Sequence, residues 1–251
     1  MKLNAFISMA AAGIALLAIS VPGNAANSDS YIESSVRDTY IFMVYLKDDD
    51  IKVECKDGIV KLTGVVADGM KKTLAQETVA GLPDVKGVDN RLEVRGAPPT
   101  ANSDAWIHDK VKSALMFHRR VNANGTEVNV RDGVVTLRGD AVNQAQKELT
   151  TVYAKDVEGV KSVNNEMTVA KNPKKESTVK EDIDDASITA QVKLTLLYHR
   201  STSAISTSVT TKKGVVTLYG KARNAAELKL ATELANDVNG VAGVNNRMVI
   251  E

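Results

Sequence analysis

The sequence contains few of the residues that catalytic and metal sites require. Its 251 residues include one cysteine and three histidines, which excludes a disulfide framework within the chain and argues against a Cys/His zinc site. There are 32 Lys and Arg against 31 Asp and Glu, so net charge gives no reason to expect nucleic-acid binding. No Gly-x-Ser-x-Gly, His-Glu-x-x-His or phosphate-binding loop occurs. We therefore expect no enzymatic activity, no metal and no cofactor.

A long apolar run is found only at the N-terminus. Lys2 precedes an apolar stretch from Ala5 to Val21, and small residues follow, ending at Ala25. This order is typical of a secretory signal peptide, so we predict a signal peptide over residues 1–25 and export of the remaining chain. The alternative is an uncleaved anchor helix, which the short stretch disfavours against a bilayer core of about 30 Å.

The single cysteine lies in a predicted strand. Cys55 alternates with Ile51 and Val53, a spacing that places the three side chains on one face. We predict a buried, unreactive thiol rather than a nucleophile.

One unit occurs three times in the chain. The runs 58–64, 133–139 and 214–220 share a Gly-x-Val-x-Leu-x-Gly pattern and lie 75 and 81 residues apart. The same offsets align further positions without gaps, which defines repeat 1 (29–95), repeat 2 (103–170) and repeat 3 (184–251), with a linker at 171–183. Both connecting segments contain proline, so we expect them to keep the repeats apart without locking them. Each repeat is nevertheless small enough that contact between copies would stabilise it.

Periodicity predicts the same elements in every repeat. In repeat 2, Ile107, Val111, Ala114 and Leu115 form one helical face, and Asp132-Gly133 predicts a tight hairpin turn. A second helix and a last strand follow, and this strand should lie parallel to a hairpin strand because a helix connects them. The predicted fold class is α+β, with three tandem αββαβ domains, each a three-stranded mixed sheet packed on one face by two helices.

These motifs resemble a known family. The glycine run, the following helix and the Gly-Val-x-x-Val-Asn-Asn ending, seen at 159–165 and 240–246, are similar to the BON domain. The resemblance implies an exported, non-enzymatic protein that supports the cell envelope under osmotic stress through anionic phospholipid contact or client binding. A periplasmic location is implied in the same way. Repeat 1 departs from the pattern, because Asp84 replaces the first glycine of the ending.

Two histidine-arginine pairs recur at the end of the first helix. His118-Arg119 and His199-Arg200 occupy equivalent positions in repeats 2 and 3. We interpret them as features of the repeat rather than as parts of one composite site.

An aromatic and cationic stripe suggests a binding surface. Trp106, Lys110, Ser113 and Phe117 follow helical spacing beside the core face of repeat 2. Rings and cations arranged in this way are typical of helices at a membrane interface. The alternative is that the rings cover the edge of the core or pack one copy on the next.

Charge distinguishes the repeats as lipid-binding candidates. The net charge is −3 for repeat 1, 0 for repeat 2 and +2 for repeat 3, so repeat 1 is the least suited to an anionic bilayer. We predict that repeats 2 and 3 contact an anionic phospholipid membrane surface. The residues predicted to bind lipid are Trp106, Lys110, Phe117, Arg119, Arg120, Arg200, Lys212 and Lys213.

Two other functions are compatible with the sequence. Three linked copies could act as a periplasmic chaperone that holds outer-membrane or secreted clients weakly at several points. They could also act as a spacer between envelope components. Nucleic-acid binding is disfavoured by export and by the absence of a basic stripe, and the sequence does not define the oligomeric state.

Overall fold

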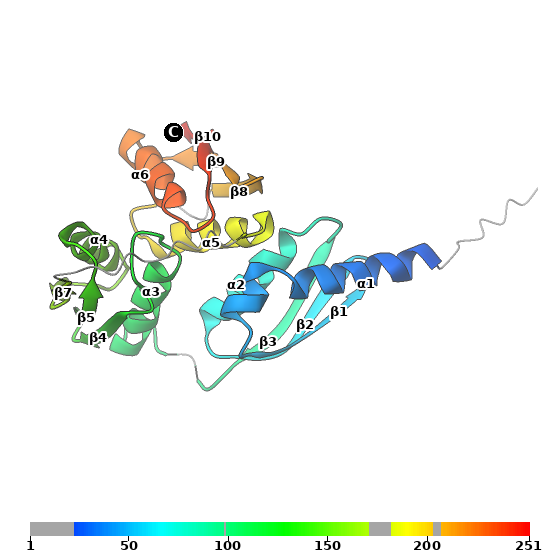
Figure 1. The fold of residues 1–251 in the computed structure, drawn as a ribbon, viewed down its shortest axis with the longest axis horizontal. Coiled ribbons are helices and arrows are strands. Elements are labelled where there is room, and N and C mark those ends of the chain that lie inside the picture. The colour runs from blue at the N-terminus through cyan, green and yellow to red at the C-terminus, as the bar shows by residue number, and fades with distance from the viewer. Residues whose placement is uncertain (1–22, 98, 171–181, 203–206) are drawn as a thin grey trace, which may run out of the picture.

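The three repeats form three similar α+β units that pack together (Figure 1). The computed structural model describes residues 23–97, 99–170, 182–202 and 207–251. Each unit has a helix, a β-hairpin, a second helix and a final strand. The predicted fold class is therefore confirmed.

The elements follow one another in the same order in each repeat. Repeat 1 contains α1 (Gly23–Arg37), the π-helix η1 (Ile41–Tyr45), β1 (Asp50–Lys56), β2 (Ile59–Val66), α2 (Gly69–Ala80) and β3 (Gly87–Val94). Repeat 2 contains α3 (Asp104–Met116), β4 (Thr126–Arg131), β5 (Val134–Ala141), α4 (Gln144–Lys155), β6 (Ser162–Asn165) and β7 (Thr168–Val169). Repeat 3 contains α5 (Asp185–Tyr198), β8 (Thr207–Lys212), β9 (Val215–Ala222), α6 (Ala225–Asn236), β10 (Gly243–Asn246) and β11 (Val249–Ile250).

The hairpin turns have the geometry that the sequence predicts. Asp132 and Gly133 both have positive φ, at 53° and 77°, which matches the twist of the flanking antiparallel strands. The last strand of each repeat lies parallel to the second hairpin strand, as expected for a helical crossover. In repeats 2 and 3 this last strand is interrupted, giving β6 with β7 and β10 with β11.

A recurring asparagine fixes the last strand to the second helix. In repeat 2 the Asn165 side chain donates to the carbonyl oxygen of Lys147 and to the Thr151 hydroxyl of α4, at 2.8 and 2.7 Å. Its own oxygen accepts the Met167 backbone N–H at 3.0 Å. Asn246 makes equivalent bonds in repeat 3. The asparagine of the Val-Asn-Asn ending therefore has a structural role.

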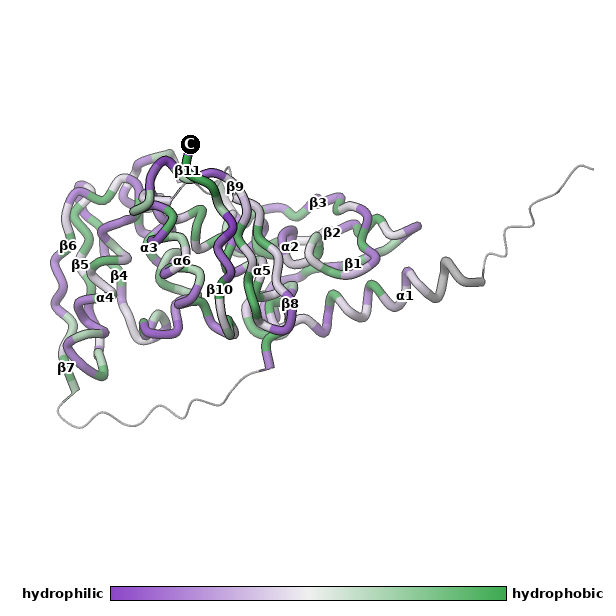
Figure 2. The backbone as a smooth tube through the Cα atoms, turned by 90° about the horizontal axis from the view of Figure 1, so that it is seen from above, coloured by the Kyte–Doolittle hydropathy of each residue, from purple (hydrophilic) through white to green (hydrophobic). Residues whose placement is uncertain are grey.

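Helix α5 lies at the centre of the molecule, between repeat 1 and repeat 2 (Figures 1 and 2). Most of its residues are buried all round the helix, including Ala190, Gln191 and Thr195. One face covers the sheet of repeat 3, and the others contact α2 and α3. The expectation that the connecting segments keep the repeats apart is therefore wrong, because apolar surface on α5 is buried only when the repeats pack together.

Polar contacts join repeat 1 to the start of α5. Asp184 caps α5 by accepting the Ser187 backbone N–H, and its second oxygen accepts the Tyr40 backbone N–H at 2.8 Å. Lys193 forms an ion pair with Glu77 of α2 at 2.7 Å. The start of α5 thus holds the segment between α1 and η1 of repeat 1 through Tyr40. Further along α5, Lys193 holds α2.

The single thiol is half-buried and hydrogen-bonded. Cys55 donates to the Asp29 carboxylate at 3.3 Å, and burial together with that carboxylate raises the pKa of the thiol to about 11. Such a thiol is a poor nucleophile at neutral pH, which agrees with the predicted lack of reactivity, although the side chain is only partly buried rather than buried as predicted. Of the predicted signal peptide, residues 1–22 lie outside the described residues.

Candidate functional site

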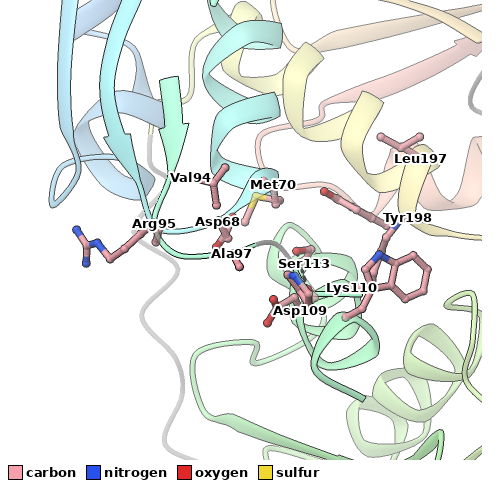
Figure 3. A pocket seen from close by; sticks show the side chains of 14 residues that line it. Asp68, Met70, Val94, Arg95, Ala97, Asp109, Lys110, Ser113, Leu197 and Tyr198 are labelled. Carbon is pink, nitrogen blue, oxygen red and sulfur yellow. Dashed lines mark hydrogen bonds between the residues drawn. The ribbon is translucent and has the colours of Figure 1, made fainter. Parts of the chain in front are cut away.

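A pocket of about 480 Å³ lies where the three repeats meet (Figure 3). Its walls come from the start of α2, the end of β3 and the segment after it, one face of α3 and the end of α5. The labelled lining residues are Asp68, Met70, Val94, Arg95, Ala97, Asp109, Lys110, Ser113, Leu197 and Tyr198, and Trp106 also lines the pocket. Only packing between repeats creates this pocket.

Helix α3 brings Trp106 and Lys110 to the pocket. The Ser103 side chain accepts the Trp106 backbone N–H at 3.2 Å and so begins the helix. One turn later, the Lys110 ammonium lies 4.7 Å from the centre of the Trp106 ring and 5.0 Å from that of Tyr198. These distances are typical of cation–π contacts. The structure thus unites two of the predicted lipid-binding residues with a ring from repeat 3.

The acidic groups at the pocket already have partners. Asp68 caps α2 by accepting the Lys71 backbone N–H at 2.8 Å, and Asp109 pairs with His108 Nδ1 at 2.9 Å. Burial raises the pKa of Tyr198 to about 12, so its phenol is neutral.

The remaining groups make the pocket amphipathic. Lys110 supplies positive charge, while Met70, Val94 and Leu197 supply apolar walls. The Arg95 guanidinium points away from the other lining side chains (Figure 3). Such an arrangement suits a ligand with an anionic head and an apolar body.

Phe117 does not belong to a surface stripe. Its side chain is 0% exposed, and its ring packs edge-on against Tyr45 of repeat 1, with ring centres 5.5 Å apart. The prediction that Phe117 is available to lipid is therefore wrong. The alternative prediction, that a ring packs one repeat on another, is correct for Phe117. Repeat 1 covers the face of this residue that an isolated repeat would expose.

The three predicted arginines hold repeat 2 to repeat 3. The Arg119 guanidinium donates to the carbonyl oxygens of Asn236 and Val241, the latter at 3.1 Å. Arg120 Nε lies 2.5 Å from Asp237, and in the reverse direction Arg200 Nε lies 3.6 Å from Asp156. All three arginines remain exposed to solvent. In the structure these arginines hold repeat 2 to repeat 3, a role that the sequence did not predict.

His118 and His199 meet in one buried cluster. Their Nε2 atoms are 3.2 Å apart, so the expectation that the two pairs form no composite site is wrong. His118 Nδ1 lies 3.2 Å from Asp237, and His199 Nδ1 lies 3.1 Å from Asp156. Tyr153 stacks on His118, with ring centres 3.9 Å apart. We call these five residues the histidine junction.

Burial and hydrogen bonding set the charges in the histidine junction. Burial lowers the pKa of His118, although Asp237 acts against this effect. Burial acts to raise the pKa of Asp237, but hydrogen bonds from His118, Tyr153 and Arg120 hold it below the ordinary value. Asp156 is likewise kept ionised, through His199 and Ser201, against the effect of burial. The junction therefore contains two ionised carboxylates, of which Asp237 is buried and Asp156 is partly buried.

A sequence signal for this junction exists. The histidine and the aspartate occur together in repeats 2 and 3, at positions 81 residues apart, whereas repeat 1 has Met43 and Gly81 there. Both residues are present in repeats 2 and 3, and both are absent from repeat 1. This pattern indicates a reciprocal contact between repeats 2 and 3.

Lys212 and Lys213 lie apart from the pocket residues in the sequence, at the turn between β8 and β9. Both side chains are exposed, and Lys213 has a φ of 52° in the turn. Its backbone N–H donates to Asp185 at 2.7 Å. These lysines are available to solvent-borne anions.

Within the described ranges, no cluster of three or more His, Cys, Asp or Glu side chains could hold a metal ion. Across the same residues, no helix has the length and apolar character needed to cross a membrane.

Sequence comparison agrees with the repeated architecture. A BON domain match covers residues 28–96, 103–171 and 184–251. The chain belongs to the BON domain family. It is 36% identical over 143 residues to osmotically-inducible protein Y of Escherichia coli, covering 57% of this chain and 70% of that protein. It is 30% identical over 146 residues to the outer membrane lipoprotein DolP of Haemophilus influenzae, covering 58% of this chain and 73% of that protein.

Among solved structures, this chain aligns with CdsD, a structural protein of the type III secretion system of Chlamydia trachomatis. The TM-score is 0.24 at 15% identity, with 88% of this chain and 90% of that chain covered. A score this low supports no structural conclusion.

Proposed function

We propose that this protein is a non-enzymatic periplasmic protein that binds anionic phospholipid surfaces and supports the cell envelope under osmotic stress. The observation that carries the proposal is the amphipathic pocket, in which the Lys110 ammonium stands beside apolar walls. Similarity to an osmotically-inducible protein and to an outer membrane lipoprotein supports the envelope role.

The pocket geometry suggests how a lipid would be held. The Lys110 ammonium rests over two rings, where it can meet a headgroup phosphate while the rings lie at headgroup depth. Met70, Val94 and Leu197 offer apolar contact to the upper part of an acyl chain. Exposed Lys212 and Lys213 add attraction to an anionic surface at about 1 kcal/mol each.

Trp106 reports on this contact because it is the sole tryptophan. The full mature chain is titrated with phosphatidylglycerol vesicles and with phosphatidylcholine vesicles, at low and high salt, while Trp106 emission and co-sedimentation are followed. We expect binding to phosphatidylglycerol alone, weakened by salt. Binding to both vesicles, or insensitivity to salt, contradicts the proposal.

A matched pair of variants locates the contact. Lys110→Gln removes the ammonium from the pocket and should weaken binding about fivefold, the equivalent of about 1 kcal/mol. Lys112→Gln lies on the same helix but does not line the pocket, so it should bind as the wild type does. Arg120→Glu is unsuitable, because the new carboxylate would face Asp237 and break the histidine junction.

A second candidate function is client holding, and a groove between α4 and α6 favours it. The groove has a volume of about 660 Å³ and apolar walls that include Leu149, Leu230 and Leu234. Val152 on its rim is 59% exposed. Exposed apolar surface of this kind can bind an unfolded chain. If the protein holds clients, it should suppress the aggregation of a denatured substrate. Lys110→Gln should keep this suppression, and Val152→Asp should lose it.

A further inference from the structure

Strand β4 forms one edge of the sheet of repeat 2. The strand order is β4-β5-β6, and β7 also pairs with β5, so no described strand lies on the outer side of β4. In an antiparallel pair, alternate residues direct their backbone N–H and C=O groups away from the partner strand. These outward groups can hydrogen-bond to another extended strand unless the protein covers them.

Repeat 1 shows which groups point off this edge and how they are covered. In β1 the Cys55 backbone N–H donates to the Glu33 carboxylate at 2.8 Å. The Val53 carbonyl oxygen accepts from the Arg37 guanidinium at 3.0 Å. Glu33 and Arg37 are one turn apart on α1 and form an ion pair at 3.5 Å. Two side chains of α1 therefore close the edge of β1.

In repeat 2 the outward groups belong to Val128 and Val130. The hairpins of the two repeats have the same register, so Val128 corresponds to Val53. In the same way Val130 corresponds to Cys55. The backbone N–H and C=O groups of Val128 and Val130 therefore point off the edge of β4, because neither residue bonds to β5 in this register.

Helix α3 does not close this edge in the way that α1 does. The positions of the two closing side chains are occupied by His108 and Lys112. His108 Nδ1 pairs with its neighbour Asp109 at 2.9 Å, and the Lys112 side chain is exposed. Among the described residues, no hydrogen bond reaches the outward groups of Val128 and Val130. The edge of β4 is therefore open where that of β1 is closed.

The exposed side chains of β4 complement a second copy of the same strand. Glu127, Asn129 and Arg131 are exposed on the outer face. If two copies pair antiparallel, the register that uses all the outward groups places Val128 of one copy opposite Val130 of the other. This register is centred on Asn129. It places Glu127 of each copy opposite Arg131 of the other, so opposite charges meet at both ends.

We propose that two copies of this chain associate through their β4 edges, so that the sheets of both repeats 2 join into one continuous sheet. Each pairing of Val128 with Val130 exchanges two backbone N–H···O bonds. On the exposed face, each Glu127 carboxylate lies across from an Arg131 guanidinium, and opposite charges across antiparallel strands stabilise the pairing. Two-fold symmetry closes the assembly at a dimer.

The equivalent strands of the other repeats lack this complementarity. In repeat 1 the two charged positions are Lys52 and Lys56, so self-pairing of β1 would bring like charges together. In repeat 3 the two positions are Ser208 and Lys212, which form no ion pair. Of these three described strands, only β4 has opposite charges at the two positions.

Sedimentation velocity of the full mature chain, over a wide range of protein concentration, measures the association. We expect a reversible equilibrium between monomer and dimer, because the paired edges of two strands make a small interface. Added salt should weaken the dimer, because salt screens exposed ion pairs.

Charge reversal tests the register. Glu127→Arg and Arg131→Glu, each made alone, place like charges opposite each other at both ends of the interface. Each variant should therefore dimerise about tenfold more weakly than the wild type, or worse. In a mixture of the two variants, one chain has a basic β4 and the other an acidic β4, so a heterodimer should form. The double variant, Glu127→Arg with Arg131→Glu, should again dimerise with itself.

Lys56→Glu is the matched control. It reverses a charge at the position of β1 that corresponds to Arg131, on an edge that α1 closes. This variant should dimerise as the wild type does. Heterodimer formation in the mixture also shows that both charge-reversal variants are folded.

Several results would overturn the proposal. A wild-type chain that stays monomeric at every concentration has no such interface. A dimer that survives both single reversals uses another surface, and a mixture that fails to associate has another register. Hydrogen exchange examines the edge directly. If the Val128 and Val130 amides become protected only when an unfolded polypeptide is added, the edge binds a client strand and not a second copy.

Discussion

At the scale of single residues, one aspartate does the same task in all three repeats. Asp29, Asp104 and Asp185 each accept the two backbone N–H groups of the hairpin turn in their own repeat. In repeat 2 the donors are Asp132 and Gly133, at 2.8 and 2.9 Å. The aspartate thereby fixes the first helix to the turn, a link that helical periodicity alone does not reveal.

This link predicts a pH-dependent contribution to stability. The backbone hydrogen bonds from Gly133 and Asp132 lower the pKa of Asp104 below its ordinary value of 3.8. The stabilisation is therefore complete above pH 3.8 and is lost as the pH falls through the lowered value. Asp104→Asn should lower the urea midpoint at pH 7, and the difference from the wild type should shrink in acid. Asp109→Asn on the same helix is the control, and an equal loss in that variant would contradict the role of Asp104.

At the scale of elements, the start of α5 has a double role that the start of α3 lacks. Ser103 caps α3 alone, whereas Asp184 caps α5 and also accepts the Tyr40 N–H of repeat 1. Asp184→Ala should cost more than the about 0.5–2 kcal/mol expected for a cap, and Ser103→Ala should stay within that range. Urea denaturation measures both.

Hydrogen exchange distinguishes the two roles of Asp184. Exchange of the Tyr40 amide should accelerate in Asp184→Ala and stay unchanged in Ser103→Ala, because the Tyr40 N–H donates to Asp184 across repeats. Equal exchange in both variants would mean that Asp184 acts only as a helix cap.

The sequence predicted the elements of each repeat but not the contacts between repeats. The apolar stripe at Ile107, Val111 and Leu115 is buried as expected, since helical periodicity and turn chemistry are local. Phe117 carries no local signal of its burial, because repeat 1 covers it. Of the predicted site, Trp106 and Lys110 do come together, because both lie on one face of α3. Their third partner, Tyr198, comes from another repeat and could not be placed from one helix.

At the scale of the whole molecule, the contacts of α5 make the three repeats depend on one another. Repeats of this size have marginal cores by themselves, and α5 completes its burial against α2 and α3. Phe117 and Tyr45 add an aromatic contact between repeats 1 and 2. The described repeats should therefore unfold as one cooperative unit.

Calorimetry of the mature chain tests this cooperativity. We expect one transition whose calorimetric enthalpy equals the van't Hoff enthalpy. Phe117→Ala removes a fully buried ring and should cost about 3–5 kcal/mol. Because about 1 kcal/mol shifts the Tm of a chain of this size by about 2–4 °C, the whole transition should move down by about 6–20 °C. Val152→Ala, at a 59% exposed position, should leave the Tm nearly unchanged. A separate transition that Phe117→Ala leaves in place would show that the repeats unfold independently, in which case the pocket between them would not persist as a fixed site.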